Sequence, residues 1–276
     1  SARLWTEADG FYKTRDGNTT IVQPGADGES LVQPDWDSKC DTPSGSSVNG
    51  KTTAAADTYT QTRVRIAGGT GSLDAEANTA KLSWEGSFTV AYYGGMTYWS
   101  ASDPKVVVEA DGSGTVTATL SGYRADMDDM SKWSRLAERE VVIATLSGVK
   151  VSEKGLTVTP DYLGVSVPED VAGRNAQAQR TSDNESWWGA FPADFVRFQI
   201  ETGQSSYWYT TEGSAGTIQP RKVPLPLTVC ATADCSVTSQ AATSGPASID
   251  IVQQAIQPPG APTPPRALTA PEAQAV

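Results

Sequence analysis

The feature that most constrains the fold is a series of short segments rich in Val, Thr, Ile and aromatic residues, each bounded by Gly, Asp or Pro. They include YTQTRVRIAGG, AKLSWEGSFTVAYY, KVVVEA, GTVTATLSGYRA, REVVIATLSGVKVSE and GLTVTPDYLGVSV. β-Branched and aromatic residues favour strands, whereas Gly, Asp and Pro favour turns. Short strands at such regular spacing are typical of sandwiches and barrels. The sequence therefore predicts an all-β fold, mainly antiparallel and sandwich- or barrel-like.

One segment departs from this pattern. In SWWGAFPADFVRFQIETGQ the apolar residues Trp188, Phe191, Phe195 and Phe198 follow a helical spacing. Pro192 suits the first turn of a helix, and a glycine at 203 suits its end. We expect a short helix over residues 191–202, and a second helical turn is conceivable in ADMDDMSKWSRLAERE.

Composition divides the 276 residues into three parts. Residues 1–56 form a polar, loop-rich segment, either separate or part of the main domain. Residues 57–240 contain the strand series and form the predicted β domain. Residues 241–276 are rich in Pro and Ala, which predicts an extended stalk or linker.

The net charge and the cysteines restrict the classes of partner and the cellular compartment. A net charge of −11 argues against nucleic acid or an anionic membrane as partner, and no apolar run approaches the roughly 18 residues of a transmembrane helix. Cys230 and Cys235, with four residues between them in VCATADCSV, predict a small disulfide loop. Disulfides are typical of extracellular proteins. Cys40 is the third cysteine, and its pairing with one of the other two stays open.

Catalytic motifs are missing from the sequence. The chain has no histidine, so Ser-His-Asp, Cys-His and zinc hydrolase arrangements cannot form. Asp128 and Asp129 are adjacent and read more simply as solvated surface charge than as a glycosidase pair. EADGSGTV and the Gly-rich AGGTGSLD read as β-turns. We therefore expect that the protein is not an enzyme.

The aromatic residues are the remaining candidates for a site. Seventeen of the 22 lie between Trp84 and Tyr209, and VAYYGGMTYW at 90–99 places four of them around a Gly-Gly turn. A β-sandwich core needs such volume, but so does a site for a planar apolar ligand. Tyrosinate is a known ligand of haem iron. From the residues alone both interpretations stay open.

The strand series resembles the HtaA domain, a surface domain of haem-acquisition proteins in actinobacteria. The residues that carry the resemblance are Gly71-Ser72-Leu73-Asp74, Trp84-Glu85-Gly86-Ser87-Phe88-Thr89-Val90, Tyr92-Tyr93-Gly94-Gly95, Asp103-Pro104-Lys105-Val106 and Val142-Ile143-Ala144-Thr145-Leu146-Ser147-Gly148. The region from Trp188 to Tyr209 is similar to the closing part of one HtaA subtype. The similarity covers about residues 58–230.

The resemblance implies an extracellular or cell-surface β domain that binds haem. In haem-binding members a Tyr near the start of the domain ligates iron, and a His in a Gly-His-Asp-Gly turn supports it. Here Tyr93 stands where that His would fall, and Gly94 replaces the Asp. Tyr12 is the better candidate for the iron ligand and Tyr59 the weaker one. The candidate cofactor-binding residues are Tyr93, Tyr12, Tyr92 and Tyr98.

Two hypotheses of function follow. The first is a surface protein that binds or relays haem in iron acquisition, with a haem-donor or haem-acceptor protein as partner. The second is a structural or interaction module of the cell envelope that uses the fold without haem and contacts envelope proteins or further copies of itself. A carbohydrate-binding adhesin that uses surface Trp and Tyr is a third, weaker alternative.

Overall fold

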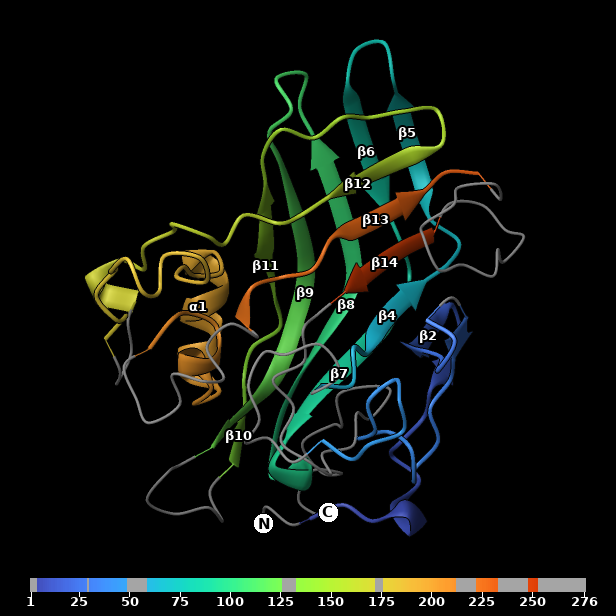
Figure 1. The fold of residues 1–276 in the computed structure, drawn as a ribbon, viewed down its shortest axis with the longest axis vertical. Helices are drawn as coiled ribbons and strands as arrows, with labels where there is room; N and C mark the ends of the chain where they lie inside the picture. Colours follow the sequence, from blue (N-terminus) through green and yellow to red (C-terminus); the bar gives the residue numbers. More distant parts are fainter. Residues whose placement is uncertain are drawn as a thin grey trace.

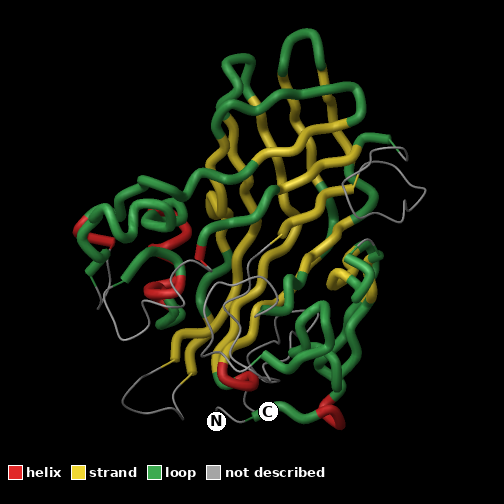
Figure 2. Tube along the Cα trace, viewed as in Figure 1, coloured by secondary structure: helices red, strands yellow, loops and turns green. Residues whose placement is uncertain are grey.

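The structure is a computed structural model that describes residues 4–28, 30–48, 59–125, 133–171, 176–211, 222–232 and 248–252. The described residues form mainly antiparallel β-sheet with a single α-helix, as the sequence predicts (Figure 1). Figure 2 shows the strands running through the body of the molecule, with α1 to one side and a 3₁₀ turn at the lower end of the strands.

The first sheet has seven strands among the described residues and has the order β1-β2-β4-β14-β13-β12, with β3 paired to β2. Its strands are β1 (Arg15–Asp16), β2 (Thr19–Pro24), β3 (Leu31–Val32), β4 (Arg63–Ile66), β12 (Gly155–Val158), β13 (Leu227–Cys230) and β14 (Ser248–Val252). β2 comes from the polar N-terminal segment and pairs with β4. β14 lies within the range 241–276, for which the sequence predicts a stalk, yet it pairs with both β4 and β13.

The second sheet also has seven strands in the described part of the chain. Its strands are β5 (Thr70–Asp74), β6 (Thr79–Ser83), β7 (Ser87–Tyr92), β8 (Thr97–Val108), β9 (Gly114–Ala125), β10 (Trp133–Arg135) and β11 (Arg139–Leu146). The long strands β8 and β9 pair along their length at its centre. β6 and β7 share the outer edge of β8, and β10 and β11 share the outer edge of β9.

Turn residues act as the sequence predicts. Gly17 and Asn18 close the hairpin of β1 and β2 after Asp16, with Gly17 at a φ of 55°. The hairpin of β8 and β9 closes through a backbone bond from the Glu109 N–H to the Ser113 carbonyl, and Asp111 accepts bonds from the Ser113 backbone and hydroxyl. Such side-chain bonds to the nearby backbone favour turns over continued strands.

The predicted helix forms as α1 (Ala193–Glu201), with Pro192 at its N-cap and a left-handed glycine at 203. Phe195 and Phe198 of the predicted stripe are buried in α1, together with Val196 and Gln199, whereas Trp188 and Phe191 precede the helix. The described residues also form four short 3₁₀ turns: η1 (Glu7–Asp9), η2 (Tyr93–Gly95), η3 (Glu169–Val171) and η4 (Ser205–Tyr207). The second helical turn is not found in the described part of its segment, where Trp133–Arg135 is strand β10; residues 126–132, with Asp128 and Asp129, lie outside the described residues.

The main core lies between the sheets and continues under α1. It joins Ile66 and Val229 of the first sheet to Leu120 of the second and to Phe195 of the helix. Trp99 of β8 packs edge-on against Phe195 and Trp208, with ring centroids 5.3 and 5.7 Å away. The aromatic residues therefore supply much of the core volume, as a large sandwich requires.

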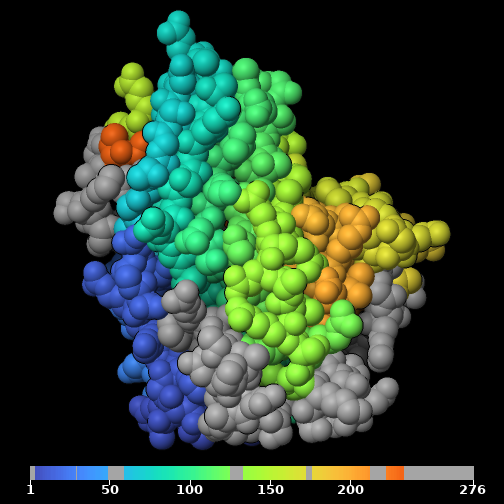
Figure 3. Space-filling model, turned by 180° about the vertical axis from the view of Figure 1, so that it is seen from behind, coloured from blue at the N-terminus to red at the C-terminus, as the bar shows by residue number. Residues whose placement is uncertain are grey.

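A second cluster lies on the other face of the second sheet. It contains Trp5, Ala91, Tyr98 and Tyr123, with Phe11 and Trp133 packed against them, and we call it the back cluster. Figure 3, seen from behind, shows the N-terminal segment in blue along the lower end of this face. The β7–β8 hairpin therefore packs on both faces, with Tyr92 in the main core and Ala91 and Tyr98 in the back cluster.

Candidate functional site

The turn between β7 and β8 places the first candidate residue. It is a 3₁₀ turn, η2 (Tyr93–Gly95), in which three successive residues have positive φ: 51° at Tyr93, 69° at Gly94 and 97° at Gly95. Glycine adopts this region freely, whereas a residue with a Cβ is strained there by roughly 1–2 kcal/mol. Tyr93 is also 47% exposed. A strained and exposed aromatic residue held by its surroundings is typical of functional sites.

Tyr93 meets Tyr207 at this turn. Their two hydroxyl groups form a hydrogen bond in which either can donate. The ring of Tyr207 in turn stacks on Tyr92, with centroids 5.2 Å apart and an interplanar angle of 14°. The Trp99 indole N–H donates to the hydroxyl of Tyr92 over 3.4 Å. We call Tyr92, Tyr93 and Tyr207 the tyrosine cluster.

The electrostatics of this cluster differ from residue to residue. Burial, followed by the hydrogen bond to Tyr93, raises the pKa of Tyr207 well above its ordinary value of 10.0. Burial likewise raises the pKa of Tyr92. Both phenols therefore stay protonated at neutral pH and can donate hydrogen bonds. Tyr207 can therefore donate its hydroxyl hydrogen to the oxygen of Tyr93.

Lys222 supports the segment that carries Tyr207. Its amine is buried and donates to the carbonyl oxygens of Ser206 (2.8 Å) and Tyr209 (2.6 Å) and to the Thr211 hydroxyl (3.2 Å). Burial lowers the pKa of Lys222 to about 7, although three oxygen acceptors favour its protonated form. Lys222 thus fixes the backbone on both sides of Tyr207.

The other predicted site residues lie apart from this pair. Successive residues of a strand point to opposite faces, so Tyr98, which pairs with Ala91, lies in the back cluster and not beside Tyr92. Tyr12 donates its hydroxyl to the Pro34 carbonyl over 3.3 Å and contacts the ring of Trp36. The four predicted tyrosines therefore do not form one site.

The surroundings of Tyr12 do not favour a phenolate. Burial, with smaller effects from Cys40 and Asp35, raises the pKa of Tyr12. Lys39 is the neighbouring cation, but its amine lies over the Trp36 ring, 3.7 Å from the centroid, and 6.0 Å from that of Tyr12.

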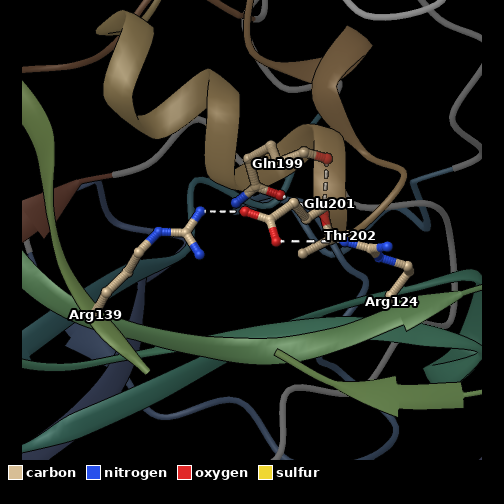
Figure 4. A network of polar contacts seen from close by, with 5 residues as sticks. All are labelled: Arg124, Arg139, Gln199, Glu201 and Thr202. Carbon is tan, nitrogen blue, oxygen red and sulfur yellow. Dashed lines mark hydrogen bonds and ion pairs between the residues drawn. The ribbon is translucent and has the colours of Figure 1, made fainter. Parts of the chain in front are cut away.

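A charged network lies on the same face of the second sheet as Tyr92 (Figure 4). The Glu201 carboxylate accepts from Arg139 on one side and lies 3.6 Å from Arg124 on the other. Arg139 also lies over the Phe198 ring, 5.1 Å from its centroid. Arg124 is largely exposed and retains charge beyond what Glu201 neutralises.

The strand register sets the place of Arg124 relative to the tyrosines. Tyr92 pairs with Thr97, and Trp99 pairs with Gly122. Continuing this register by two residues brings Thr97 beside Arg124. Arg124 is therefore two strands from Tyr92, or about 10 Å across the sheet.

The amide of Gln199 lies deepest in this region. Gln199 is fully buried, its side-chain oxygen accepts from the Thr202 hydroxyl over 2.9 Å, and its amide nitrogen has no hydrogen-bond partner among the described residues. Figure 4 shows it on α1 above Glu201. We have no physical account of this donor.

Two residues of the site were not predicted from the sequence. The separation of 114 residues between Tyr207 and Tyr93 gives no local signal of their contact. Trp5 likewise has no motif of its own in the sequence, although it packs against the turn of Tyr93. Tyr59, the weaker candidate ligand, lies at the start of the segment that leads into β4.

Three further features concern other parts of the chain: the predicted disulfide, groups that could hold a metal ion, and helices that could span a membrane. Cys230 ends β13, but Cys235 lies outside the described residues, so the disulfide between them is not tested. Within the described ranges, no three Cys, Asp or Glu side chains converge to hold a metal ion. No helix in the described part of the chain has the length and apolar character needed to cross a membrane.

Comparison with known proteins gives no relative: no family model, no curated protein and no solved structure matches this chain.

Proposed function

We propose that this protein binds haem at the tyrosine cluster, as an extracellular or cell-surface protein of HtaA type in iron acquisition. The observation that carries the proposal is the hydrogen bond between Tyr93 and Tyr207. The motif resemblance places a haem-supporting residue at the position of Tyr93. In this proposal the roles differ from those in haem-binding members: Tyr93 itself is the iron ligand, and Tyr207 takes the supporting role that the His has there.

The residues of the site fit this group. Tyr93 would hold the iron through its phenolate oxygen, and Tyr207 would donate the hydrogen bond that stabilises this negative charge. The ring of Tyr92 stacks on the ring of Tyr207 and supports its position. Arg124 would attract the carboxylate groups at the edge of the porphyrin. When bound, haem would supply a ferric centre that the protein stores or passes to a partner.

Titration of the purified chain with hemin tests this proposal. We expect the Soret band to shift and to saturate at one haem per chain, with a visible band from the bond between phenolate and ferric iron. Iron-free protoporphyrin is the matched control, because it keeps the planar body and carboxylates but offers no metal to Tyr93. It should bind more weakly. A hemin spectrum equal to the sum of free hemin and free protein would contradict the proposal.

A second candidate function is supported by a different observation. Leu4 is 63% exposed and lies beside Gly94, where a Cβ would be 2.8 Å from it, and Tyr93, the residue before Gly94, is 47% exposed. Exposed apolar residues that adjoin can contact a partner. This observation favours an interaction module of the cell envelope that works without haem.

Light scattering of the chain over a range of concentrations distinguishes this alternative. Association that is abolished by Leu4→Asp, with no spectral response to hemin, would support the interaction module. A protein that stays monomeric at every concentration would count against self-association through this surface.

A further inference from the structure

We propose that Trp5 is a positioning residue for the tyrosine cluster: from the back face of the sheet it holds the Gly94-Gly95 turn, and this turn places Tyr93 against Tyr207 on the front face. The N-terminal segment would then set the geometry of the site without contacting a ligand. Only the hemin measurement at the end of the test rests on the proposed function.

Trp5 is firmly anchored. It is 5% exposed and belongs to the back cluster. Its ring lies 5.3 Å from that of Phe11 and 5.2 Å from that of Tyr98, measured between centroids. Aromatic pairs at such distances stabilise beyond the area that they bury. Trp5 is therefore fixed to β8 independently of the turn.

The Gly94-Gly95 turn bonds to Trp5 and packs closely against it. The Trp5 backbone N–H donates to the Gly94 carbonyl over 2.7 Å. A Cβ on Gly95 would overlap the Trp5 indole ring. The glycine at position 95 is thus required both by its φ of 97° and by the closeness of the indole.

The Gly94-Gly95 turn fixes the backbone conformation of Tyr93. Tyr93 directly precedes the two glycines and has left-handed backbone itself, a conformation that persists only where neighbours impose it. On one side the β7–β8 ladder ends at Tyr92 and Thr97. On the other side, Trp5 bonds to the next residue, Gly94. Without the Trp5 indole, the backbone N–H that bonds to Gly94 would lose its anchor in the back cluster, and the turn would lose the ring that packs against Gly95. Tyr93 would then be free to adopt an ordinary backbone conformation away from Tyr207.

A purely structural role for Trp5 predicts something different. If Trp5 only attaches the N-terminal segment, its loss would lower stability but leave the contact between Tyr93 and Tyr207 unchanged. The coupling between these two hydroxyl groups is therefore the readout that separates the two roles. It is measured from the unfolding equilibria of Tyr93→Phe, Tyr207→Phe and the double variant.

We expect a coupling of roughly five-fold in the unfolding equilibrium constant for the otherwise unchanged chain, as for a typical hydrogen bond. In the Trp5→Ala background the coupling should vanish, and Trp5→Phe should restore part of it. Trp36→Ala is the matched control, since it removes another N-terminal tryptophan that contacts Tyr12 and Lys39 instead of the turn, and it should leave the coupling intact. The same coupling in Trp5→Ala as in the unchanged chain would overturn the proposal, and so would its absence from the unchanged chain.

A second variant covers the case in which Trp5→Ala fails to fold. Gly95→Ala drives the turn away from an intact Trp5, whereas Gly148→Ala also places a side chain at positive φ, 66°, but in open space. Gly95→Ala should abolish the coupling and Gly148→Ala should preserve it. Preservation in both would overturn the proposal.

Hemin affinity then separates this inference from the proposed function. If the proposed function holds, Trp5→Ala should weaken hemin binding at least as much as Tyr207→Phe does. Hemin binding that is unchanged in Trp5→Ala would overturn the inference while leaving haem binding in place. Loss of the coupling in a protein that never binds hemin would support the inference and contradict the proposed function.

Discussion

The hydroxyl groups of Tyr93 and Tyr207 share a hydrogen bond although 114 residues separate them in the chain. Tyr93 lies on the turn that ends the β7–β8 hairpin, and Tyr207 lies on η4, just beyond helix α1. The fold thus brings a hairpin end and a helical excursion together at one exposed pair of phenols. The predictions below test what this pair and its surroundings do.

Replacing Tyr207 tests the hydrogen bond itself. Tyr207→Phe keeps the ring that stacks on Tyr92 but removes the donor to Tyr93. Because a hydrogen bond to a charged group contributes more than a neutral one, we expect hemin affinity to fall roughly ten-fold or more. Tyr162→Phe is the matched control, since that hydroxyl is buried beside Thr210 at 3.5 Å and away from the cluster. Equal effects of the two changes on hemin binding would refute the role of Tyr207.

The buried amine of Lys222 predicts a dependence of stability on pH. Burial lowers its pKa to about 7 from an ordinary 10.5, so between these values the unfolded chain binds a proton that the folded chain does not. The free energy of unfolding should therefore rise as pH increases from about 7 towards 10, and this contribution is lost as pH falls through 7.

Urea unfolding at several pH values checks this dependence. Lys222→Met should reduce the increase in unfolding free energy between about pH 7 and 10, whatever its effect on stability at a single pH. Lys39→Met is the control, because this lysine is only half-buried. A slope that is unchanged by Lys222→Met would show that the three accepting oxygens hold the amine protonated throughout.

The network of Glu201 predicts a small effect that depends on salt. Glu201 is partly exposed and interacts with both Arg139 and Arg124, so Glu201→Gln should cost about 1 kcal/mol of unfolding free energy at low salt and less in about 1 M NaCl. Glu140→Gln, which removes the more exposed pair with Lys105, should cost less. A larger loss for Glu140→Gln would contradict this ranking.

The predicted disulfide can be checked directly. A non-reduced digest should yield a peptide that joins Cys230 to Cys235, and a peptide that joins Cys40 to either residue would contradict this pairing. Reduction should then lower stability by about 2 kcal/mol, because the closed loop is short. Cys40→Ser should leave that difference unchanged.

Features set by local chemistry could be predicted from the sequence. The all-β class follows from the strand composition, and the helix from the stripe that includes Phe195 and Phe198 together with its flanking Pro192. The turns at Asp16-Gly17 and Asp111 follow from residues that bond or bend the backbone locally. Each of these signals acts within a few residues, so no tertiary knowledge is needed.

Features that depend on register or long-range pairing could not be predicted. Tyr92 and Tyr98 lie on opposite faces because of the register across a turn with three successive left-handed residues, and the sequence does not reveal that register. The contact between Tyr93 and Tyr207 requires the packing of α1 against the sheet. β14 lies in a range whose Pro and Ala content predicts a stalk, yet its ladder partners are β4 and β13.

The most direct test of the central claim compares two tyrosines as iron ligands. Hemin is titrated into Tyr93→Phe and Tyr12→Phe, and the band from phenolate bound to ferric iron is followed in each. We predict that Tyr93→Phe loses this band and most of its affinity, while Tyr12→Phe keeps both. Retention of the band in Tyr93→Phe with its loss in Tyr12→Phe would contradict the account.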